Sequence, residues 1–385
     1  MKKNLVIIGA NEFQNPLILR AKEMGYTTHV FAWQCGDVGE RTADYFYPVS
    51  IVEKERILDI CRAIRPVGVV SIGSDLASIT VNYVAEKLGL VCNGMDSAMR
   101  ATNKHLMRLA FEKAGLPSCR SVPVESAGDF QKYGFSLPVI IKPTDRSGSR
   151  GIFKVQREED LPSAIELARA HSFEKQVLME EFAEGREYSI EYVSWQGEHR
   201  FLACTEKFTT GAPLFVETGH LQPAYHMDES VLDKIKALVP RILDCLGVRY
   251  GASHTELKID SRGEIKIIEC GARMGGDCIG SDLVHLSTGI DYVAACVDIA
   301  CGKAPKLEPE FPGRVSAVRF IFGEDDLRAL EYVRENYPDA ICRVSDILPI
   351  DGREISDSST RYGCYILASD TMDEMRHILS HLALE

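Results

Sequence analysis

Residues 253–277 read SHTELKIDSRGEIKIIECGARMGGD. Apolar and polar side chains alternate on both sides of the Asp-Ser-Arg-Gly turn at residues 260–263, and this pattern predicts a β-hairpin. Two registers fit the turn: one places Glu256 opposite Glu269 and the other places it opposite Ile267. In either register the two glutamates lie on the same face, because side chains alternate with a period of two.

Two carboxylates on one face of a hairpin repel each other unless a cation lies between them. Glu256 and Glu269 supply the hard oxygen donors that Mg²⁺ or Mn²⁺ prefers, which predicts a metal ion that holds phosphates. His254 shares their face and could contact a substrate or a phosphate, although a hydrogen-bonded structural histidine is an equal alternative. Arg273, in a glycine-rich turn, could place its guanidinium on a transferred phosphoryl group.

Upstream of this hairpin, an apolar strand at residues 137–143 carries Lys142 near its end and leads to the loop Ser-Gly-Ser-Arg-Gly at residues 147–151. A fixed cation beside a loop rich in backbone N–H groups suits the oxygens of a polyphosphate. The sequence contains no Gly-x-x-x-x-Gly-Lys-Ser/Thr motif, so an ATP site of the P-loop kind is excluded. Taken alone, the element favours a plainer interpretation, a solvated charge at a strand end and a flexible turn.

A second acidic hairpin is predicted at residues 177–193, VLMEEFAEGREYSIEYV. The backbone between its strands could pair with the edge of an adenine, and Glu187 could accept hydrogen bonds from both hydroxyls of a ribose. By itself this segment indicates only an acidic hairpin, so its meaning depends on its neighbours in the chain.

Short apolar strands alternate with amphipathic helices in the first part of the chain, which predicts a doubly wound parallel sheet. The first turn, GANEFQNP, lacks the Gly-x-Gly-x-x-Gly pattern of dinucleotide sites. One helix is predicted over residues 97–115, and the segment from about residue 310 onward predicts a small α+β lobe of alternating strands and helices.

The composition excludes several kinds of partner. The 385 residues include 44 Lys and Arg against 56 Asp and Glu, a formal net charge of −12. Such a chain has no general means of neutralising a nucleic acid or an anionic membrane, so we expect neither as a partner and favour small molecules. No apolar run is long enough for a membrane span or signal, which predicts a cytoplasmic protein. The 12 cysteines form no Cys-x-x-Cys pair, which indicates reduced thiols.

The order of these elements resembles the ATP-grasp superfamily of carboxylate–amine ligases, a group with amino-acid ligases, phosphoribosylglycinamide synthetases and biotin carboxylase-like enzymes. The resemblance runs from Lys104 on a helix, through Lys142, EEFAEGRE and TELK, to IIECGARMGG. It implies a mixed α/β and α+β fold with three domains. These are a doubly wound parallel-sheet domain preceding the grasp at 1–95, an ATP-grasp domain at 96–309 with a flexible lid at about 118–190, and a small C-terminal α+β lobe at 310–385.

The same resemblance implies ATP as cofactor together with Mg²⁺ or Mn²⁺. The residues it assigns to the nucleotide are Lys104, Lys142, Ser147, Gly148, Ser149 and Gly151 around the phosphates, Glu180, Glu181, Phe182 and Ala183 around the adenine, and Glu187 at the ribose. Glu256 and Glu269 would hold the metal, and Arg273, with His254, would act on the reacting groups. Members commonly carry Asn two residues after the second metal Glu, where this chain has Gly271.

The segment TEKFTTGAPLFVETGHLQP, residues 205–223, resembles a substrate-side loop of the branch that joins amino acids. Glu217 could pair with an α-amino group and His220 could orient the incoming amine. A surface loop with incidental charges has equal weight. Arg319 and Arg361, in the last lobe, could reach a substrate carboxylate.

The resemblance implies an enzyme that forms an amide bond with ATP through an acyl phosphate, joining an amino acid or another small carboxylate to an amine. Two alternatives stay open. One is a purine-pathway ligase acting on a phosphoribosyl amine, or a carboxylase-type enzyme. The other is a nucleotide-binding regulatory protein without turnover, which Gly271 keeps open. A homodimer is a further expectation, because dimers are common in the superfamily.

Overall fold

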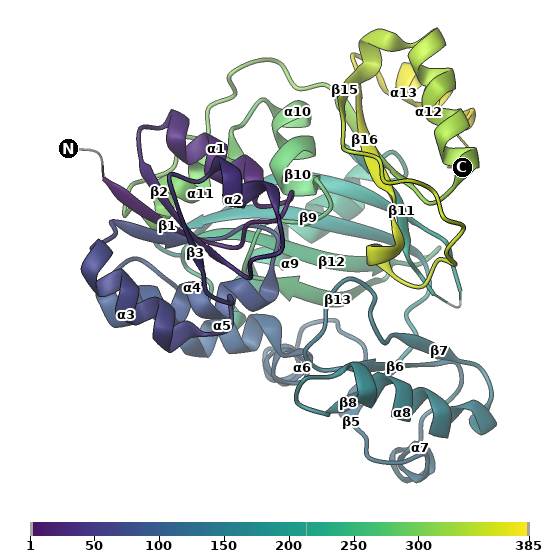
Figure 1. Cartoon of the computed structure of the whole chain (residues 1–385). Coiled ribbons are helices and arrows are strands. Elements are labelled where there is room, and N and C mark those ends of the chain that lie inside the picture. The colour runs from purple at the N-terminus through teal and green to yellow at the C-terminus, as the bar shows by residue number, and fades with distance from the viewer. Residues whose placement is uncertain (1–2, 213, 383–385) are drawn as a thin grey trace.

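A computed structural model describes residues 3–212 and 214–382. The outermost residues of the first and last predicted domains, 1–2 and 383–385, and residue 213 in the predicted substrate loop lie outside the described residues. The described chain forms sheets of four, eight and four strands, with helices packed on them (Figure 1). The predicted mixture of a parallel-sheet domain and antiparallel α+β parts is confirmed.

The first sheet is parallel, with the strand order β3-β2-β1-β4. Its strands are β1 (Asn4–Ile8), β2 (Thr27–Ala32), β3 (Tyr45–Pro48) and β4 (Gly68–Val70). Leu5 and Ile7 face one side of β1 while Val6 and Ile8 face the other, and all four are buried. A strand that is apolar on both faces requires helices on both sides, which is the doubly wound arrangement.

Helices from two distant parts of the chain cover this sheet. They are α1 (Asn15–Glu23), α2 (Val38–Thr42), α3 (Lys54–Ile64), α4 (Asp75–Leu88) and α11 (Tyr292–Ala300). Residues of α1 and α11 belong to the core on one face, and residues of α3 and α4 belong to the core on the other. Since α11 follows the 253–277 hairpin in sequence, it ties the first sheet to the central part of the molecule.

The helix predicted over residues 97–115 is two helices, α5 (Met95–Thr102) and α6 (Lys104–Lys113). Asn103 has an extended backbone between them, and its side-chain oxygen accepts hydrogen bonds from the backbone N–H groups of His105 and Leu106. The single-helix prediction was wrong because an asparagine side chain competes for these N–H groups and begins a new helix. Lys104 is therefore the first residue of α6 rather than an interior residue of one long helix.

The central sheet has eight antiparallel strands in the order β13-β12-β9-β10-β11-β14-β16-β15. Its members are β9 (Arg186–Trp195), β10 (Glu198–Thr209), β11 (Glu217–Gln222), β12 (Gly251–Ile259), β13 (Ile265–Gly271), β14 (Val315–Ile321), β15 (Ile341–Val344) and β16 (Gly363–Ser369). Helix α9 (Glu229–Leu246) packs its apolar stripe on one face, together with α6. The last three strands continue this sheet directly, with β14 paired to β11.

The predicted hairpin at residues 253–277 is formed by β12 and β13. Glu256 lies opposite Glu269, as one of the two predicted registers requires. A β-bulge between Glu256 and Leu257 then shifts the pairing by one residue, so that Leu257 lies opposite Ile267. Neither predicted register therefore holds along the whole hairpin, because one extra residue on β13 shifts the strand pairing by one position beyond Glu256.

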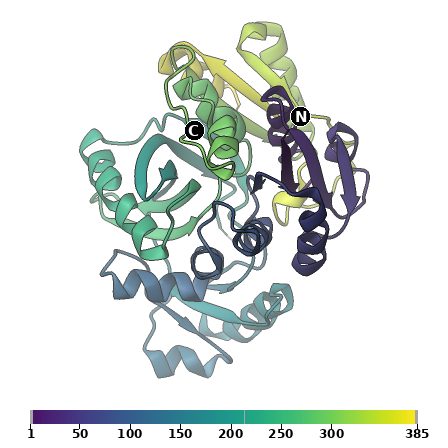
Figure 2. The same cartoon turned by 90° about the vertical axis from the view of Figure 1, so that its left-hand side faces the viewer.

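A smaller antiparallel sheet, in the order β5-β8-β6-β7, lies apart from the other two (Figures 1 and 2). Its elements are β5 (Ser121–Pro123), α7 (Gly128–Tyr133), β6 (Val139–Pro143), β7 (Phe153–Val155), α8 (Leu161–His171) and β8 (Val177–Glu181). It has a core of its own, in which Ile165 of α8 packs with Ile141 and Met179. This sheet and the central sheet enclose the site described below.

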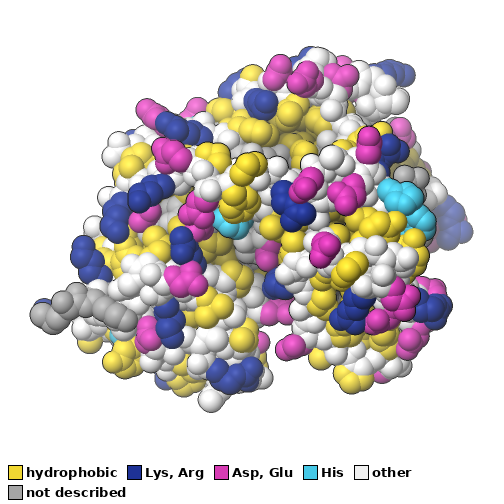
Figure 3. Space-filling model, turned by 90° about the horizontal axis from the view of Figure 1, so that it is seen from above, with side chains coloured by type: hydrophobic (Ala, Val, Ile, Leu, Met, Phe, Trp, Pro, Cys, Tyr) yellow, Lys and Arg dark blue, Asp and Glu magenta, His cyan; other side chains and the backbone are white. Residues whose placement is uncertain are grey.

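The C-terminal part packs α12 (Glu324–Asn336) and α13 (Met372–Ser380) on β14 and β16. The short helix α10 (Val284–Thr288) follows the glycine-rich turn after β13. No single helix in the described ranges is long and apolar enough to cross a membrane; residues 279–288 and 292–300 reach that standard only as a pair bent by 118°. The face in Figure 3 intersperses Lys and Arg with Asp and Glu. All 12 cysteines are free thiols, as predicted.

Candidate active site

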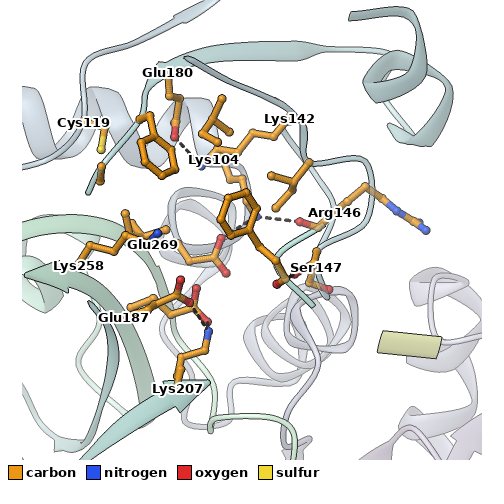
Figure 4. Close-up of a pocket in the computed structure, with 18 of the residues that line it drawn as sticks. Lys104, Cys119, Lys142, Arg146, Ser147, Glu180, Glu187, Lys207, Lys258 and Glu269 are labelled. Atoms are coloured by element: carbon orange, nitrogen blue, oxygen red, sulfur yellow. Dashed lines mark hydrogen bonds and ion pairs between the residues drawn. The ribbon is translucent and has the colours of Figure 1, made fainter. Parts of the chain in front are cut away.

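A pocket of about 850 Å³, counting its open mouth, lies between the small sheet and the central sheet (Figure 4). The predicted site residues that line it are Lys104, Lys142, Ser147, Gly148, Ser149, Glu180, Glu181, Phe182, Ala183, Glu187, Glu217, Glu256 and Glu269. Other lining residues are Cys119, Ile140, Arg146, Ile152, Lys207, Phe215, Lys258 and Ile268. The fold thus brings the hairpin at 253–277, the segment 177–193 and both predicted lysines to one cavity. The prediction of a hairpin at 177–193 was wrong, because its first strand, β8, pairs in the small sheet and its second, β9, pairs in the central sheet.

Lys104 enters the pocket from the first turn of α6. Its Nζ lies 2.8 Å from Glu269 Oε2 and donates a hydrogen bond of 2.8 Å to the carbonyl oxygen of Arg146. Burial alone would lower the pKa of Lys104, but the carboxylates of Glu269 and Asp75 outweigh burial and raise it. Lys104 therefore remains a cation that links the glycine-rich loop to the 253–277 hairpin.

Lys142 lies on β6 and contacts a buried carboxylate. Its Nζ is 2.5 Å from Glu180 Oε2. Arg108 donates hydrogen bonds of 2.9 and 3.0 Å to the two oxygens of the same carboxylate. Burial, and the nearby Arg108 and Lys104, lower the pKa of Lys142. Burial would raise the pKa of Glu180, but the two cations outweigh it and lower that pKa to about 2.

Arg108 is a site residue that the sequence interpretation missed. It lies four residues after Lys104 on α6, a spacing that places both side chains on one face of the helix. That spacing was the only signal available. The side chain of Glu180, which the resemblance directs toward adenine, is engaged by Arg108 and Lys142 in the structure. Residues 181–183 also line the pocket, and the backbone N–H of Glu181 donates a hydrogen bond of 3.0 Å to the carbonyl oxygen of Arg120.

Two lysines stand beside the paired glutamates of the hairpin. Lys104 contacts Glu269, and Lys207 Nζ lies 2.7 Å from Glu256 Oε1. Lys207 also lies 2.7 Å from Glu187, and Figure 4 shows these two side chains side by side. Burial would lower the pKa of Lys207, but the surrounding carboxylates raise it well above its ordinary value. The repulsion anticipated from the sequence is therefore offset by side chains of the protein itself.

The residues present were compared with what a divalent metal requires. Within residues 3–212 and 214–382, no group of three or more His, Cys, Asp and Glu side chains is arranged to hold a metal ion. Glu256 and Glu269 nevertheless present facing carboxylates to the pocket. Burial would raise the pKa of Glu256, but Lys207 and His254 lower it well below its ordinary value, so it is ionised. Two facing carboxylates fit Mg²⁺ when phosphate oxygens complete its coordination.

His254 lies beside the pocket, with both ring nitrogens already in contact. Nδ1 contacts Glu191, and Nε2 lies 3.1 Å from Glu256 Oε1. Burial would lower the pKa of His254, but the two carboxylates raise it to about 9. Arg273 makes a two-bond ion pair of 2.8 and 3.2 Å with Asp75, at the start of α4. Neither predicted reactive residue lines the pocket wall.

The predicted substrate segment, residues 205–223, is mainly strand, since β10 extends to Thr209 and β11 begins at Glu217. His220 is 1% exposed on β11, and neither ring nitrogen has a hydrogen-bond partner among the described residues. The interpretation of this part as a surface loop was wrong for residues 217–222, because β11 is paired on both edges and residues 219–222 are all buried.

Glu217 lies at the pocket, and Arg361 of the C-terminal part reaches it. Arg361 Nη2 is 3.4 Å from Glu217 Oε2, and Nη1 is 2.9 Å from Asp277 Oδ1. Burial, opposed by Lys207 and Arg361 and reinforced by Asp277, raises the pKa of Glu217 to about 7. Arg319 instead pairs with Asp326 at 2.9 Å and does not line the pocket.

The glycine-rich loop after β6 closes one side of the pocket. Gly148, Ser149 and Gly151 all have positive φ, and a Cβ on Gly151 would lie 2.8 Å from Cβ of His171. Ser149 Oγ donates a hydrogen bond of 3.3 Å to the carbonyl oxygen of Phe215, which precedes β11. The loop therefore spans from the small sheet to the central one, although Gly151 itself faces away from the cavity wall.

A family model described as "ATP-grasp domain" matches residues 135–282, the stretch that contains β6, β7 and β8 of the small sheet and the hairpin at 253–277. Residues 135–282 form an ATP-grasp domain. The solved L-amino acid ligase from Bacillus licheniformis superposes on the whole chain with a TM-score of 0.82, covering 99% of this chain and 97% of that one at 23% identity. The solved phosphoribosylglycinamide synthetase from Anaerococcus prevotii superposes with a TM-score of 0.77 at 20% identity, covering 99% of this chain and 98% of that one. These superpositions show that this chain has the same fold as both solved enzymes, including the parts before and after residues 135–282.

Sequence relatives extend beyond the ATP-grasp domain. Alanine–anticapsin ligase from Bacillus subtilis (strain 168) is 28% identical over 301 residues, which cover 69% of this chain and 63% of that protein. Carnosine synthase 1 from Mus musculus is 24% identical over 358 residues, which cover 83% of this chain and 42% of that protein. The chain therefore spans less than two thirds of the length of either of these two relatives.

Proposed function

We propose that this protein is an ATP-dependent carboxylate–amine ligase that forms an amide bond between two small molecules, one of them an amino acid. One observation carries the proposal. Lys104, Lys142, Glu256 and Glu269 converge from separate segments on one cavity beside the loop at 147–151. The named activities of alanine–anticapsin ligase and of the L-amino acid ligase support an amino-acid substrate.

In this proposal the ATP phosphates bind between Lys104, Lys142 and the Ser-Gly loop, whose members are Ser147, Gly148, Ser149 and Gly151. The adenine lies against the stretch Glu180, Glu181, Phe182 and Ala183, and the ribose reaches Glu187. Glu256 and Glu269 hold Mg²⁺ or Mn²⁺, which when bound neutralises phosphate charge. Fixed cations and a water-excluding loop are what phosphoryl transfer requires, since positioning and charge neutralisation supply most of its catalysis.

The reaction has two steps. A carboxylate oxygen of the substrate attacks the γ-phosphorus of ATP, so that ADP leaves and an acyl phosphate forms. The amine nitrogen then attacks the acyl carbon, phosphate leaves, and the nitrogen loses a proton. In this proposal Arg273 acts on the acyl phosphate, which requires that its pair with Asp75 open. The loop at 147–151 keeps water from this intermediate.

The substrate end of the pocket is assigned to Glu217, which accepts the α-amino group of an amino acid. An ammonium group beside Glu217 would favour its ionised form, whereas burial disfavours that form in the free protein. Arg361, rather than Arg319, is the arginine that contacts Glu217. His220 stays a proposed substrate-orienting residue. A cytoplasmic location and a homodimer stay predictions.

The test is ADP release from Mg·ATP in the presence of pooled amino acids, followed by single pairs. We expect release with at least one pair and a product of the summed mass less water. Glu269→Ala should abolish turnover without unfolding the protein, whereas Glu264→Ala, an exposed carboxylate on the same hairpin, should leave it unchanged.

Two results would replace the proposal. Release with a phosphoribosyl amine and glycine, but with no amino-acid pair, would favour the purine-pathway alternative. Binding of ATP without turnover on any substrate would favour a regulatory protein.

A further inference from the structure

A buried chain of contacts runs beneath the pocket, from the hairpin to the turn that follows it. It begins at Glu256, passes through His254 on β12 to Glu191 on β9, and ends at the backbone of Gly275. Glu191 lies directly opposite His254 in the pairing of these strands. None of the roles described so far involves Glu191.

Both oxygens of Glu191 are engaged. Oε1 contacts His254 Nδ1, and Oε2 accepts a hydrogen bond of 3.0 Å from the N–H of Gly275. The side chain of Glu191 is 0% exposed. His254 has a carboxylate on each side, so a ring that donates from both nitrogens satisfies both neighbours. Glu191 thereby fixes which way the imidazole faces, and the imidazole fixes the Glu256 carboxylate.

The second contact of Glu191 controls the turn after β13. Gly275 packs so closely that a Cβ there would lie 2.7 Å from Glu191 Oε1 and 2.9 Å from His254 Nδ1. Arg273 lies two residues earlier in the same turn, where its guanidinium is held by Asp75. The hydrogen bond to Gly275 therefore ties the backbone position of Arg273 to the same carboxylate that orients His254.

We propose that Glu191 is a positioning residue of the ligase site, one that sets both the metal-facing carboxylate of Glu256 and the turn that carries Arg273. The inference rests on the proposed function. A fully buried carboxylate is costly to stability, and apolar packing could join β9 to β12 at lower cost. Groups that orient a metal-binding side chain typically change metal affinity or activity 10–100-fold when they are altered.

The test uses the full chain, with Mg²⁺ and ADP as probes, and follows thermal stability as Mg²⁺ is titrated at fixed ADP. Glu191→Gln keeps the shape of the side chain and removes its charge. We expect the Mg²⁺ concentration needed for half of the ADP-dependent stabilisation to rise at least about tenfold. Stabilisation by ADP without Mg²⁺ should be unchanged.

The matched control is Glu206→Gln, the same substitution at a carboxylate that is 1% exposed and bound to Arg186 and His226 instead. It should lower stability without moving the Mg²⁺ midpoint. Gly275→Ala is the second variant, because its new Cβ displaces Glu191 while every charge stays in place. It should raise the Mg²⁺ midpoint too, and it serves as the test if Glu191→Gln does not fold.

The outcomes separate the two claims. A wild-type protein whose ADP binding does not depend on Mg²⁺ overturns the proposed function. If ADP binding by the wild type depends on Mg²⁺ but Glu191→Gln folds and leaves the Mg²⁺ midpoint unchanged, the positioning role alone is overturned. If Glu191→Gln does not fold, an unchanged midpoint in Gly275→Ala overturns it instead. An equal midpoint shift in Glu206→Gln also overturns it, because general loosening of the sheet would then explain the effect.

Discussion

Replacing Arg108 by Met removes one of the two cations that hold the buried carboxylate of Glu180. The two side chains are 5% and 4% exposed, and the guanidinium donates two hydrogen bonds to that carboxylate and one of 2.6 Å to the carbonyl oxygen of Ile268. Met keeps much of the apolar length of Arg108, which packs against Phe111. After the substitution, Lys142 alone faces Glu180, at 2.5 Å.

Breaking a buried ion pair by removing one partner costs about 3–5 kcal/mol. Because Lys142 remains, we expect a value near the lower end, about 3 kcal/mol. An unfolding entropy of about 2.1 cal/mol/K per residue amounts to about 0.8 kcal/mol/K for 385 residues. For one cooperative transition, the melting temperature should therefore fall by about 4 °C.

The assay is thermal and urea unfolding from pH 3 to pH 8. In the wild type, Glu180 has its pKa lowered from 4.5 to about 2, so its contribution to stability is present above about pH 4.5 and is lost as the pH falls toward 2. The Arg108 variant should lose part of that contribution. Arg200→Met, at an exposed position, is the control. A melting temperature within 1 °C of wild type at pH 7, or a Glu180→Gln/Arg108→Met double variant with fully additive losses, would refute the reasoning.

Three further predictions concern other parts of the site. Burial raises the pKa of Glu217 from 4.5 to about 7. The contribution of its protonated form to the free energy of unfolding is therefore fully present below about pH 4.5 and is lost as the pH rises through 7. In urea titrations without ligand, the wild type should therefore lose about 3 kcal/mol relative to Glu217→Gln between pH 4.5 and 8; a constant difference contradicts this. Gly185→Ala should cost at least about 2 kcal/mol in the same assay, because φ is +105° and the Cβ would lie 2.0 Å from the carbonyl oxygen of Ile259; wild-type stability would disprove the clash. Lys207→Met leaves Glu256 without its lysine, so thermal stability should fall and Mg²⁺ with ADP should restore more of it than in wild type; equal gains would argue against a shared site for lysine and metal.

The local patterns of the sequence were sufficient for the first sheet and for the hairpin at residues 253–277, but not for the pairing of the two strands at residues 177–193, which lie in different sheets. Leu5 through Ile8 form an uninterrupted apolar strand, and the turn at 260–263 separates two alternating strands, so periodicity alone predicts each element. The same patterns placed Lys142 near a strand end before a flexible loop. These features depend only on residues close together in the chain, which is why a single sequence specifies them.

Contacts between distant segments could not be predicted from the sequence. Arg108 meets Glu180 across 72 positions, and Lys207 meets Glu256 across 49. Nothing in the composition of either neighbourhood indicates the partner. His220 was placed in a loop because Glu217, His220 and Pro223 are more polar and turn-rich than a buried core needs, yet pairing on both sides makes that segment a buried strand. Such pairing is a tertiary effect that overrides local turn signals.

The charges in the site suggest why nucleotide and metal should bind together. Lys104 is held by Glu269, Lys142 by Glu180, and Lys207 by Glu256, so each cation has a carboxylate partner in the free protein. A bare triphosphate that took the lysines would leave ionised carboxylates unpaired in a half-buried cavity, at high cost. Under the proposed function, Glu256 and Glu269 would hold a divalent cation in place of the lysines, and Lys104 and Lys207 would then be free to contact phosphate oxygens. The paired charges of the free protein would therefore favour Mg·ATP over ATP alone, and the position of Glu256, which contacts Glu191 through His254, would affect how well the site accepts the cation.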